Sequence, residues 1–195
     1  MKREIIETKN VNFIGCWKIE NRNLFHNMVD FFEKNIKLQN NVAIDSGVKR
    51  KTVDILIEPK SLKNEKYLVF NQYLTELHKC YLDYKLQWPF LEETLKSVDI
   101  PSFNVQKYNP GDHFSHVHTE RSSLNSLHRV FAWMTYLNDV NDGGNTHFTH
   151  YNLKIKPEVG KTLIWPAEWT HAHAGEILKT ETKYIITGWM CYPFD

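Results

Sequence analysis

The sequence predicts an α+β protein in which N-terminal helices buttress a double-stranded β-helix, the sheet arrangement also called a jelly roll. Residues 1–100 contain two segments whose apolar residues recur at helical spacing. From Pro101 the pattern changes to short strands separated by turn residues. No repeat, low-complexity tract or linker separates the halves. We therefore expect one domain over residues 1–195, with residues 1–100 as helical buttress and flanking strands and residues 101–195 as the β core.

The first hundred residues are expected to form two strands and two helices. A strand is expected from Val11 to Ile19, and a second from Thr52 to Ile57, which is β-branched and ends before Pro59. Asn23 is the expected cap of the first helix, whose apolar face is Leu24, Phe25, Met28, Val29 and Phe32. The second helix should run from about Asn64 to Lys85, with Leu68, Leu74, Leu77, Tyr81 and Tyr84 on its apolar side. Residues 42–60, which include the basic run VKRK, form either a lid or a solvated face.

The second half is expected to form eight strands. Turns are indicated at Asn109-Pro110-Gly111, from Asn138 to Gly144 and from Pro157 to Gly160. The strands between them are Phe103 to Tyr108, Phe114 to His118, Val130 to Leu137, Thr146 to Phe148, Asn152 to Ile155, Lys161 to Trp165, His171 to Glu176 and Lys183 to Tyr192. Eight antiparallel strands in two Greek-key sheets are the cupin-like jelly roll, whose mouth holds small ligands.

The amino-acid composition indicates which classes of partner and which cellular compartment to expect. The net charge of +1 shows no basic excess, so no nucleic acid is expected as partner. The three cysteines lie far apart without a CxxC pair, which indicates reduced thiols and a cytoplasmic location. Neither a signal-peptide pattern nor 18 consecutive apolar residues is found, so we expect no membrane association.

A metal site is predicted at the end of the second β-core strand. His118 and Glu120 are two residues apart, so both side chains leave the same face of a strand. A third ligand must come from a distant strand, and His173 is the candidate. Two imidazoles and one carboxylate on one face of an octahedron leave positions open, as in non-heme Fe(II) oxygenases.

Other ligand sets and another metal were weighed. His116 alternates with His118, and His171 with His173, but His116-x-His118 supplies no anion, and His173 is better placed relative to Lys183. Two histidines and a glutamate are also a zinc hydrolase set, although the helical HExxH signature is missing. A zinc hydrolase stays open as the alternative.

Lys183 is the expected anion clamp. It lies ten residues after His173, on the next strand, where it can point into the same cavity. A buried lysine without an anion suffers a large desolvation penalty, so a carboxylate ligand such as a keto acid is its expected companion. Tyr136 could donate a phenolic hydrogen bond to that carboxylate.

Over residues 100–192 the chain resembles the prolyl 4-hydroxylase-like branch of the 2-oxoglutarate/Fe(II) dioxygenases. The matching motifs occur in order: Tyr108-x-x-Gly111, His118-x-Glu120, Tyr136-Leu137-Asn138, Gly143-Gly144-x-Thr146-x-Phe148, Pro157-x-x-Gly160, His173 with Lys183, and Trp189. The chain departs from the family pattern in one ligand, because most relatives have His-x-Asp where this chain has His118-x-Glu120.

The resemblance implies a role for each of these residues. His118, Glu120 and His173 would bind Fe(II), and Lys183 and Tyr136 would hold the distal carboxylate of 2-oxoglutarate. Tyr108 would line the cosubstrate pocket, with Thr187 and Trp189 beside it, and ascorbate is the expected reductant.

Three hypotheses about function follow. The first is a dioxygenase that hydroxylates a prolyl or other residue of a peptide or protein, releasing succinate and CO2. The second is an oxygenase of a free amino acid or other small metabolite. The third is a non-catalytic, cupin-like metal-binding module.

Overall fold

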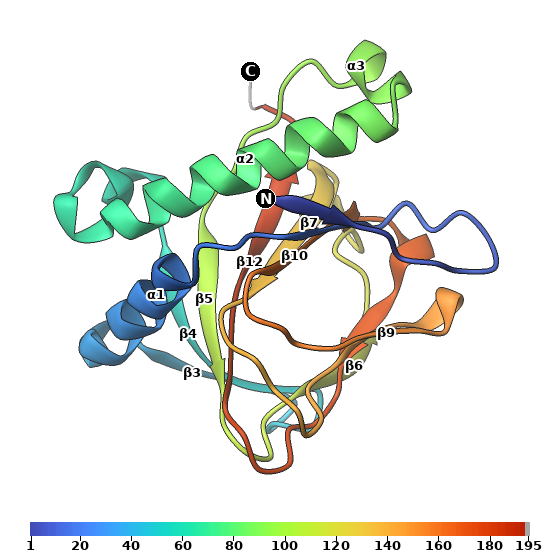
Figure 1. Ribbon diagram of the computed structural model, residues 1–195. Coiled ribbons are helices and arrows are strands. Elements are labelled where there is room, and N and C mark those ends of the chain that lie inside the picture. Colours follow the sequence, from blue (N-terminus) through green and yellow to red (C-terminus); the bar gives the residue numbers. More distant parts are fainter. Residues whose placement is uncertain (194–195) are drawn as a thin grey trace.

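The structure, a computed structural model, describes residues 1–193 and consists of two antiparallel sheets supported by helices (Figure 1). The helices are α1 (Arg22–Lys34), α2 (Leu68–Gln87) and α3 (Phe90–Thr94). The strands are β1 (Lys2–Glu4), β2 (Gly15–Lys18), β3 (Asn40–Ile44), β4 (Arg50–Ile57), β5 (Phe103–Tyr108), β6 (Phe114–His118), β7 (Arg129–Tyr136), β8 (Thr146–Phe148), β9 (Leu153–Ile155), β10 (Lys161–Pro166), β11 (His173–Gly175) and β12 (Lys183–Cys191).

The strand order is that of a jelly roll, which confirms the predicted fold class. Within residues 1–193 the large sheet has the order β1-β2-β10-β7-β12-β5-β4-β3, and the small sheet has the order β6-β11-β8-β9. From β5 to β12 successive strands alternate between the large and the small sheet, except that β8 and β9 both belong to the small sheet, which is the pattern of a double-stranded β-helix. These eight strands correspond to the eight expected from the sequence, with ends that differ by at most two residues.

The first half of the chain contributes more strands than expected. β1 and β2 extend one edge of the large sheet next to β10, and the β3–β4 hairpin extends the other edge next to β5. Residues 42–60 are therefore mostly sheet rather than a loop lid, and Val53 to Ile57 pair with Lys107 to Phe103. The sequence showed no clear signal for β3, whose residues are largely exposed.

Two apolar cores lie on the two faces of the large sheet. Along β7, Phe131 and Trp133 face the helices, whereas Ala132 and Met134 face the interior between the sheets. This alternation follows from the period of two in a strand. Figure 1 shows α1 and α2 on one side of the large sheet and β6 and β9 on the other. The inner face is therefore left for a ligand cavity.

Several predicted boundaries were wrong in the first half. α1 is capped by Asn21 rather than Asn23, because the Asn21 side chain accepts a hydrogen bond from the Leu24 N–H at 3.2 Å. α2 begins at Leu68 rather than near Asn64, and Leu68 is 55% exposed. Leu77, Tyr81 and Tyr84 are buried as predicted, together with Phe70, Tyr73 and Cys80. The strand expected from Val11 is limited to Gly15–Lys18, since Phe13 has a φ of 54° that interrupts extended backbone.

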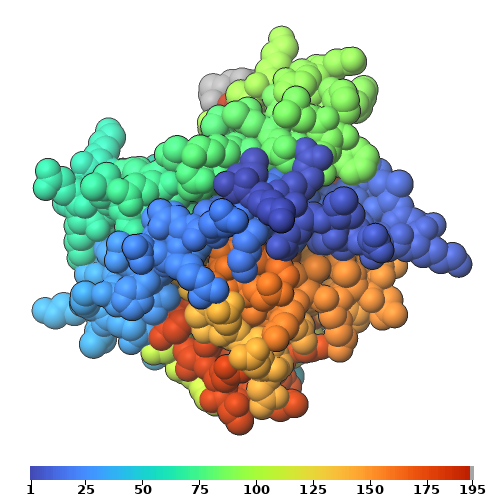
Figure 2. Space-filling model, viewed as in Figure 1, coloured from blue at the N-terminus to red at the C-terminus, as the bar shows by residue number. Residues whose placement is uncertain are grey.

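The N-terminal residues lie across one face of the molecule. In Figure 2 the dark blue segment lies between the green helical region and the orange residues of the β core. Trp17 of β2 donates its indole N–H to Asp83 of α2 at 2.7 Å, and Arg3 of β1 pairs with the same carboxylate. None of the helices among residues 1–193 has the length and apolar character needed to cross a membrane.

Candidate metal and cosubstrate site

A cavity opens between the two sheets, and most of the predicted site residues line it. The lining includes His118, Glu120, His173, Lys183 and Tyr108. Further lining residues are Thr187, Trp189, Thr146, Arg50, Asn104 and Gln106. Residues that are far apart in sequence therefore meet because the jelly roll brings the end of β6, the start of β11 and one face of β12 together.

The two histidines are cross-strand neighbours whose tautomers are fixed by the backbone. His118 ends β6 and pairs directly with His173, which begins β11. Each Nδ1 lies at hydrogen-bond distance from a carbonyl oxygen, 2.8 Å from that of His116 and 2.9 Å from that of His171. Because a carbonyl only accepts, each Nδ1 carries the proton and each Nε2 presents a lone pair, the form that binds metals.

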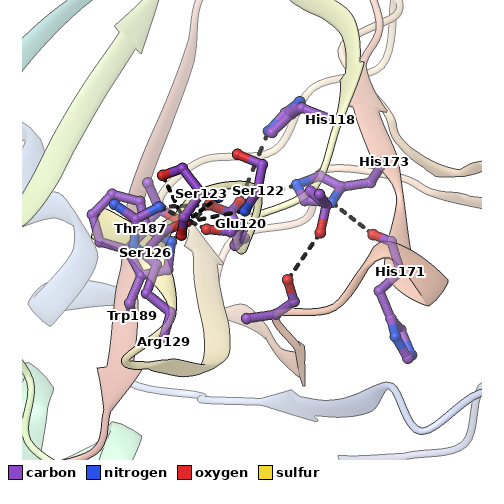
Figure 3. Close-up of polar contacts among 12 residues, drawn as sticks. His118, Glu120, Ser122, Ser123, Ser126, Arg129, His171, His173, Thr187 and Trp189 are labelled. Atoms are coloured by element: carbon purple, nitrogen blue, oxygen red, sulfur yellow. Dashed lines mark hydrogen bonds and ion pairs between the residues drawn. The ribbon is translucent and has the colours of Figure 1, made fainter.

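Glu120 completes the cluster from the segment that follows β6. Its Oε1 lies 3.4 Å from Nε2 of His173 and 3.8 Å from Nε2 of His118. One ligand atom from each residue lies within 4.8 Å of the others. Ligands at right angles around a metal at about 2.1 Å are about 3 Å apart, so a small contraction of this cluster would enclose a first-row ion. Figure 3 shows the three side chains directed toward one another.

The protonation states suit metal binding. Burial, with the neighbouring His173, lowers the pKa of His118 to about 4, so this ring is neutral near pH 7. Burial alone would raise the pKa of Glu120, but its contacts with His173 and His118, when these rings are protonated, and with the indole N–H of Trp189 outweigh burial and lower the pKa to about 2. A neutral imidazole and an ionised carboxylate are the ligand forms that a cation requires. The donor set therefore fits Fe(II).

Lys183 lies in the cavity wall as a buried cation. Its side chain is 3% exposed, its Nζ donates to the carbonyl of Gly144 at 2.8 Å, and it lies 4.5 Å from the centre of the Tyr108 ring. No carboxylate among residues 1–193 lies within ion-pair distance of this amine. Burial lowers its pKa to about 8, which expresses the cost of a buried charge without a counterion. A carboxylate ligand would supply that counterion.

Tyr136 lies outside the cavity lining, contrary to the expectation of direct contact with a ligand. Its hydroxyl is buried and donates to Oγ1 of Thr146 at 2.6 Å, because the side chain crosses from β7 to the small sheet. Thr146 does line the cavity. The Thr146 hydroxyl accepts from Tyr136 and can direct its own proton into the cavity. Thr146 belongs to one of the quoted motifs, but only the tertiary structure shows that it lines the same cavity as Lys183.

Thr187, Trp189 and Tyr108 line the cavity, but their polar atoms are already engaged within the chain. The Thr187 hydroxyl donates to the carbonyl of Trp133 at 2.8 Å, and the Tyr108 hydroxyl donates to Gln106 at 2.8 Å. The Trp189 indole N–H donates to Oε2 of Glu120 at 2.6 Å. The Trp189 N–H is therefore directed at a proposed metal ligand rather than at a cosubstrate.

Sequence reasoning missed a polar network on β4 and β5, beside the strand that carries Lys183. Asp54 of β4 accepts hydrogen bonds from Arg50, from Thr52 at 2.7 Å and from Gln106 at 3.2 Å. Arg50 lines the cavity, and its Cζ lies 5.1 Å from the centre of the Phe114 ring. Its buried Nε has no hydrogen-bond partner among residues 1–193. A basic run next to a strand was the only signal in the sequence, and a solvated face explained it equally well.

Comparison with known proteins supports this description. The sequence model of the 2OG-Fe(II) oxygenase superfamily matches residues 103–191, the range that contains all eight jelly-roll strands. No curated protein sequence matches the chain.

Solved structures share the fold at low sequence identity. A prolyl-4-hydroxylase from Pseudomonas putida has a TM-score of 0.71 at 16% identity, covering 94% of this chain and 95% of the other. A viral collagen prolyl hydroxylase from Paramecium Bursaria Chlorella virus-1, in a 2OG complex, has a TM-score of 0.67 at 16% identity, covering 92% and 96%. A prolyl hydroxylase from Trichoplax adhaerens, in complex with a hypoxia inducible factor peptide fragment, has a TM-score of 0.70 at 15% identity, covering 93% and 84%.

The fold, the His-Glu-His cluster and the sequence match lead to one assignment. Residues 103–191 match the 2OG-Fe(II) oxygenase superfamily and contain the His118, Glu120 and His173 cluster, which supports a 2-oxoglutarate-dependent dioxygenase that uses Fe(II).

Proposed function

We propose that this enzyme hydroxylates a C–H bond of a prolyl or other residue in a peptide or protein, converting 2-oxoglutarate to succinate and CO2. The observation that carries the proposal is the convergence of two imidazole Nε2 atoms and one carboxylate oxygen in a cavity that also holds an uncompensated buried lysine. Iron, 2-oxoglutarate and dioxygen together supply the oxidising power that the side chains lack.

The proposed roles follow from the position of each side chain. His118, Glu120 and His173 would hold Fe(II), and the ion would supply the binding of 2-oxoglutarate and dioxygen. Lys183 pairs with the distal carboxylate of 2-oxoglutarate, and the Thr146 hydroxyl donates to the same group. Tyr136 acts through Thr146 by orienting that hydroxyl. Tyr108 closes the cavity beside the lysine, and Thr187 contributes to the wall.

A peptide substrate is supported by polar side chains that β4 and β5 contribute to the cavity wall. Arg50, Asn104 and Gln106 line this part of the cavity and offer hydrogen-bond donors suited to the carbonyl groups of a main chain. The Trichoplax relative was solved with a peptide fragment bound, which fits the same substrate class. A free amino acid is the second candidate, because the guanidinium of Arg50 is equally suited to a carboxylate.

Several broader properties are part of the same proposal. We propose that residues 1–195 act as a single domain, supported by the strands that both halves contribute to the large sheet. Ascorbate serves as reductant for the iron. A cytoplasmic location is supported by Cys16, Cys80 and Cys191, which are all unpaired and buried. The net charge of +1 favours a partner other than nucleic acid.

The test measures succinate formed by the purified protein with Fe(II), ascorbate, 2-oxoglutarate and a panel of prolyl peptides and free amino acids. We expect turnover by the native chain and by His116→Ala, whose exposed ring lies on the same strand as His118 but outside the cluster. We expect none from His118→Ala or His173→Ala. Equal succinate from all four proteins would refute the ligand assignment, and absence of turnover in the native chain would favour a non-catalytic binding module.

A further inference from the structure

The metal ligand that departs from the family pattern is held by a neighbouring tryptophan. The two oxygens of the Glu120 carboxylate have different surroundings. Oε1 faces the histidines, at 3.4 Å from His173 and 3.8 Å from His118. Oε2 accepts the indole N–H of Trp189 at 2.6 Å and lies 3.9 Å from Nη1 of Arg129. One oxygen is therefore directed at the metal position and the other is anchored to the protein (Figure 3).

Trp189 is itself fixed in place by two contacts with β7. Its backbone pairs with Ala132 of β7, in the middle of the large sheet. The guanidinium of Arg129 lies 3.6 Å from the centre of the indole ring, and the same guanidinium donates to the carbonyl of Glu120 at 2.8 Å. Arg129 thus ties the backbone of Glu120 to the ring that bonds its side chain.

A glutamate ligand needs such an anchor more than an aspartate does. Its additional methylene adds a freely rotating bond, and fixing a glutamate side chain carries an entropic cost large enough to weaken binding by about tenfold. A longer carboxylate can also turn so that both oxygens bind the ion, which would occupy a position that the reaction needs open. A hydrogen bond to Oε2 opposes both outcomes.

We propose that Trp189 is a positioning residue that holds Glu120 as a single-oxygen ligand, and that Arg129 secures the indole for this role. The inference rests on the proposed iron-binding role of His118, Glu120 and His173. It assigns the Trp189 N–H to a metal ligand instead of to 2-oxoglutarate.

Metal binding without cosubstrate tests the inference independently of catalysis. Mn(II) and Co(II) affinities are measured by calorimetry on the native chain, Trp189→Phe, Glu120→Asp and the double variant, and the visible spectrum of bound Co(II) reports the coordination number. Phenylalanine keeps a ring under Arg129 and removes the N–H. Partners outside the ligand set typically contribute about 10–100-fold to metal affinity, so Trp189→Phe should bind at least about tenfold more weakly, with an altered Co(II) spectrum.

The aspartate background tests whether the effect depends on the length of Glu120. Aspartate withdraws the carboxylate by about 1.5 Å, one C–C bond, so the Trp189 hydrogen bond is lost and a second loss on Trp189→Phe should be absent. Trp133→Phe is the matched control, because Trp133 faces the helices on the other side of the large sheet and its buried Nε1 has no hydrogen-bond partner among residues 1–193. Its metal affinity should stay within about twofold of the native value, well below the effect expected for a lost partner of a ligand.

The outcomes distinguish failure of the metal site from failure of the positioning role of Trp189. Failure of the native chain to bind Mn(II) or Co(II) would overturn the proposed metal site itself. Native binding with an unchanged affinity and spectrum in Trp189→Phe would overturn only the positioning role. The same fold loss on Trp189→Phe in the native and Glu120→Asp backgrounds would show that Trp189 acts on general packing, and thermal unfolding of each metal-free variant confirms that the proteins compared are folded.

Discussion

Replacing Lys183 by methionine should stabilise the ligand-free enzyme while it abolishes cosubstrate binding. The pKa of this amine is lowered from 10.5 to about 8 by burial. A change of this size corresponds to about 3 kcal/mol against the charged form in the folded chain. Methionine has a similar length without the charge, but it leaves the carbonyl of Gly144 without its donor, at a cost of about 1 kcal/mol. A net gain of about 2 kcal/mol is expected at pH 7.

The pH dependence isolates the charge from other effects of the substitution. A group with a depressed folded-state pKa holds its proton in the unfolded chain over a range where the folded chain has lost it. For Lys183 that range extends from about pH 8 to 10.5, so the free energy of unfolding should rise with pH there. Between pH 7 and pH 10 this group alone should add about 2 to 3 kcal/mol to the native protein and nothing to Lys183→Met.

Urea unfolding of both proteins at pH 7, 8, 9 and 10, without metal or 2-oxoglutarate, measures this difference. Other groups titrate in both proteins, so the native-minus-variant difference is the relevant quantity. Saturating Mn(II) and 2-oxoglutarate, at about 100 times the dissociation constant, should then add about 2.7 kcal/mol to the native protein beyond any effect of the metal alone. Parallel pH profiles, or a variant less stable than the native protein at pH 7, would refute the argument that Lys183 is an uncompensated buried charge.

Three further predictions concern the cavity walls and the sheet. Tyr136→Phe and Thr146→Val should each weaken 2-oxoglutarate binding by about 5–10-fold. The double variant should lose no more affinity than the worse single variant, because both side chains act through the Thr146 hydroxyl. Additive losses measured by calorimetry would contradict this. Arg50→Met should raise the KM for peptide about tenfold or more and leave the KM for 2-oxoglutarate within about twofold. A change confined to the KM for 2-oxoglutarate would show that Arg50 binds the cosubstrate rather than the peptide. Gly160→Ala should lower the free energy of unfolding, measured in urea, by about 2 kcal/mol or more. Gly160 has a φ of +80°, and the new Cβ would lie 2.1 Å from the carbonyl oxygen of Ile19. A loss under about 0.5 kcal/mol would show that the backbone relaxes there.

The β core was predictable because its signals are local. Strand alternation and turn residues located all eight strands from β5 to β12, and the Gly143-Gly144 and Pro157-to-Gly160 turns separate strands that the structure places in different sheets. The first half was less predictable. The β3–β4 hairpin is largely exposed on its outer strand, so its apolar pattern is weak, and it exists because β5 offers an open edge for pairing.

The composition of the candidate site was also largely accessible from sequence, but its connections were not. The sequence indicated four site residues because metal-ligand side chains and a lysine are unusual on strands that line a buried cavity. They are His118, Glu120, His173 and Lys183. The partner of each was not visible. Tyr136 matched a family motif, yet its hydroxyl reaches Thr146 across the two sheets, a contact set by the packing distance between them.

The sequence by itself determined the jelly roll, the ligand types and the need for an anionic companion to Lys183, because hydrophobic period, turn chemistry and side-chain chemistry act over a few residues. Only the tertiary structure decided which oxygen of Glu120 faces the histidines and that Arg50 from an edge hairpin enters the cavity wall. Such contacts join residues far apart in the chain, and their directions are fixed by sheet pairing and side-chain packing, which local sequence patterns do not encode.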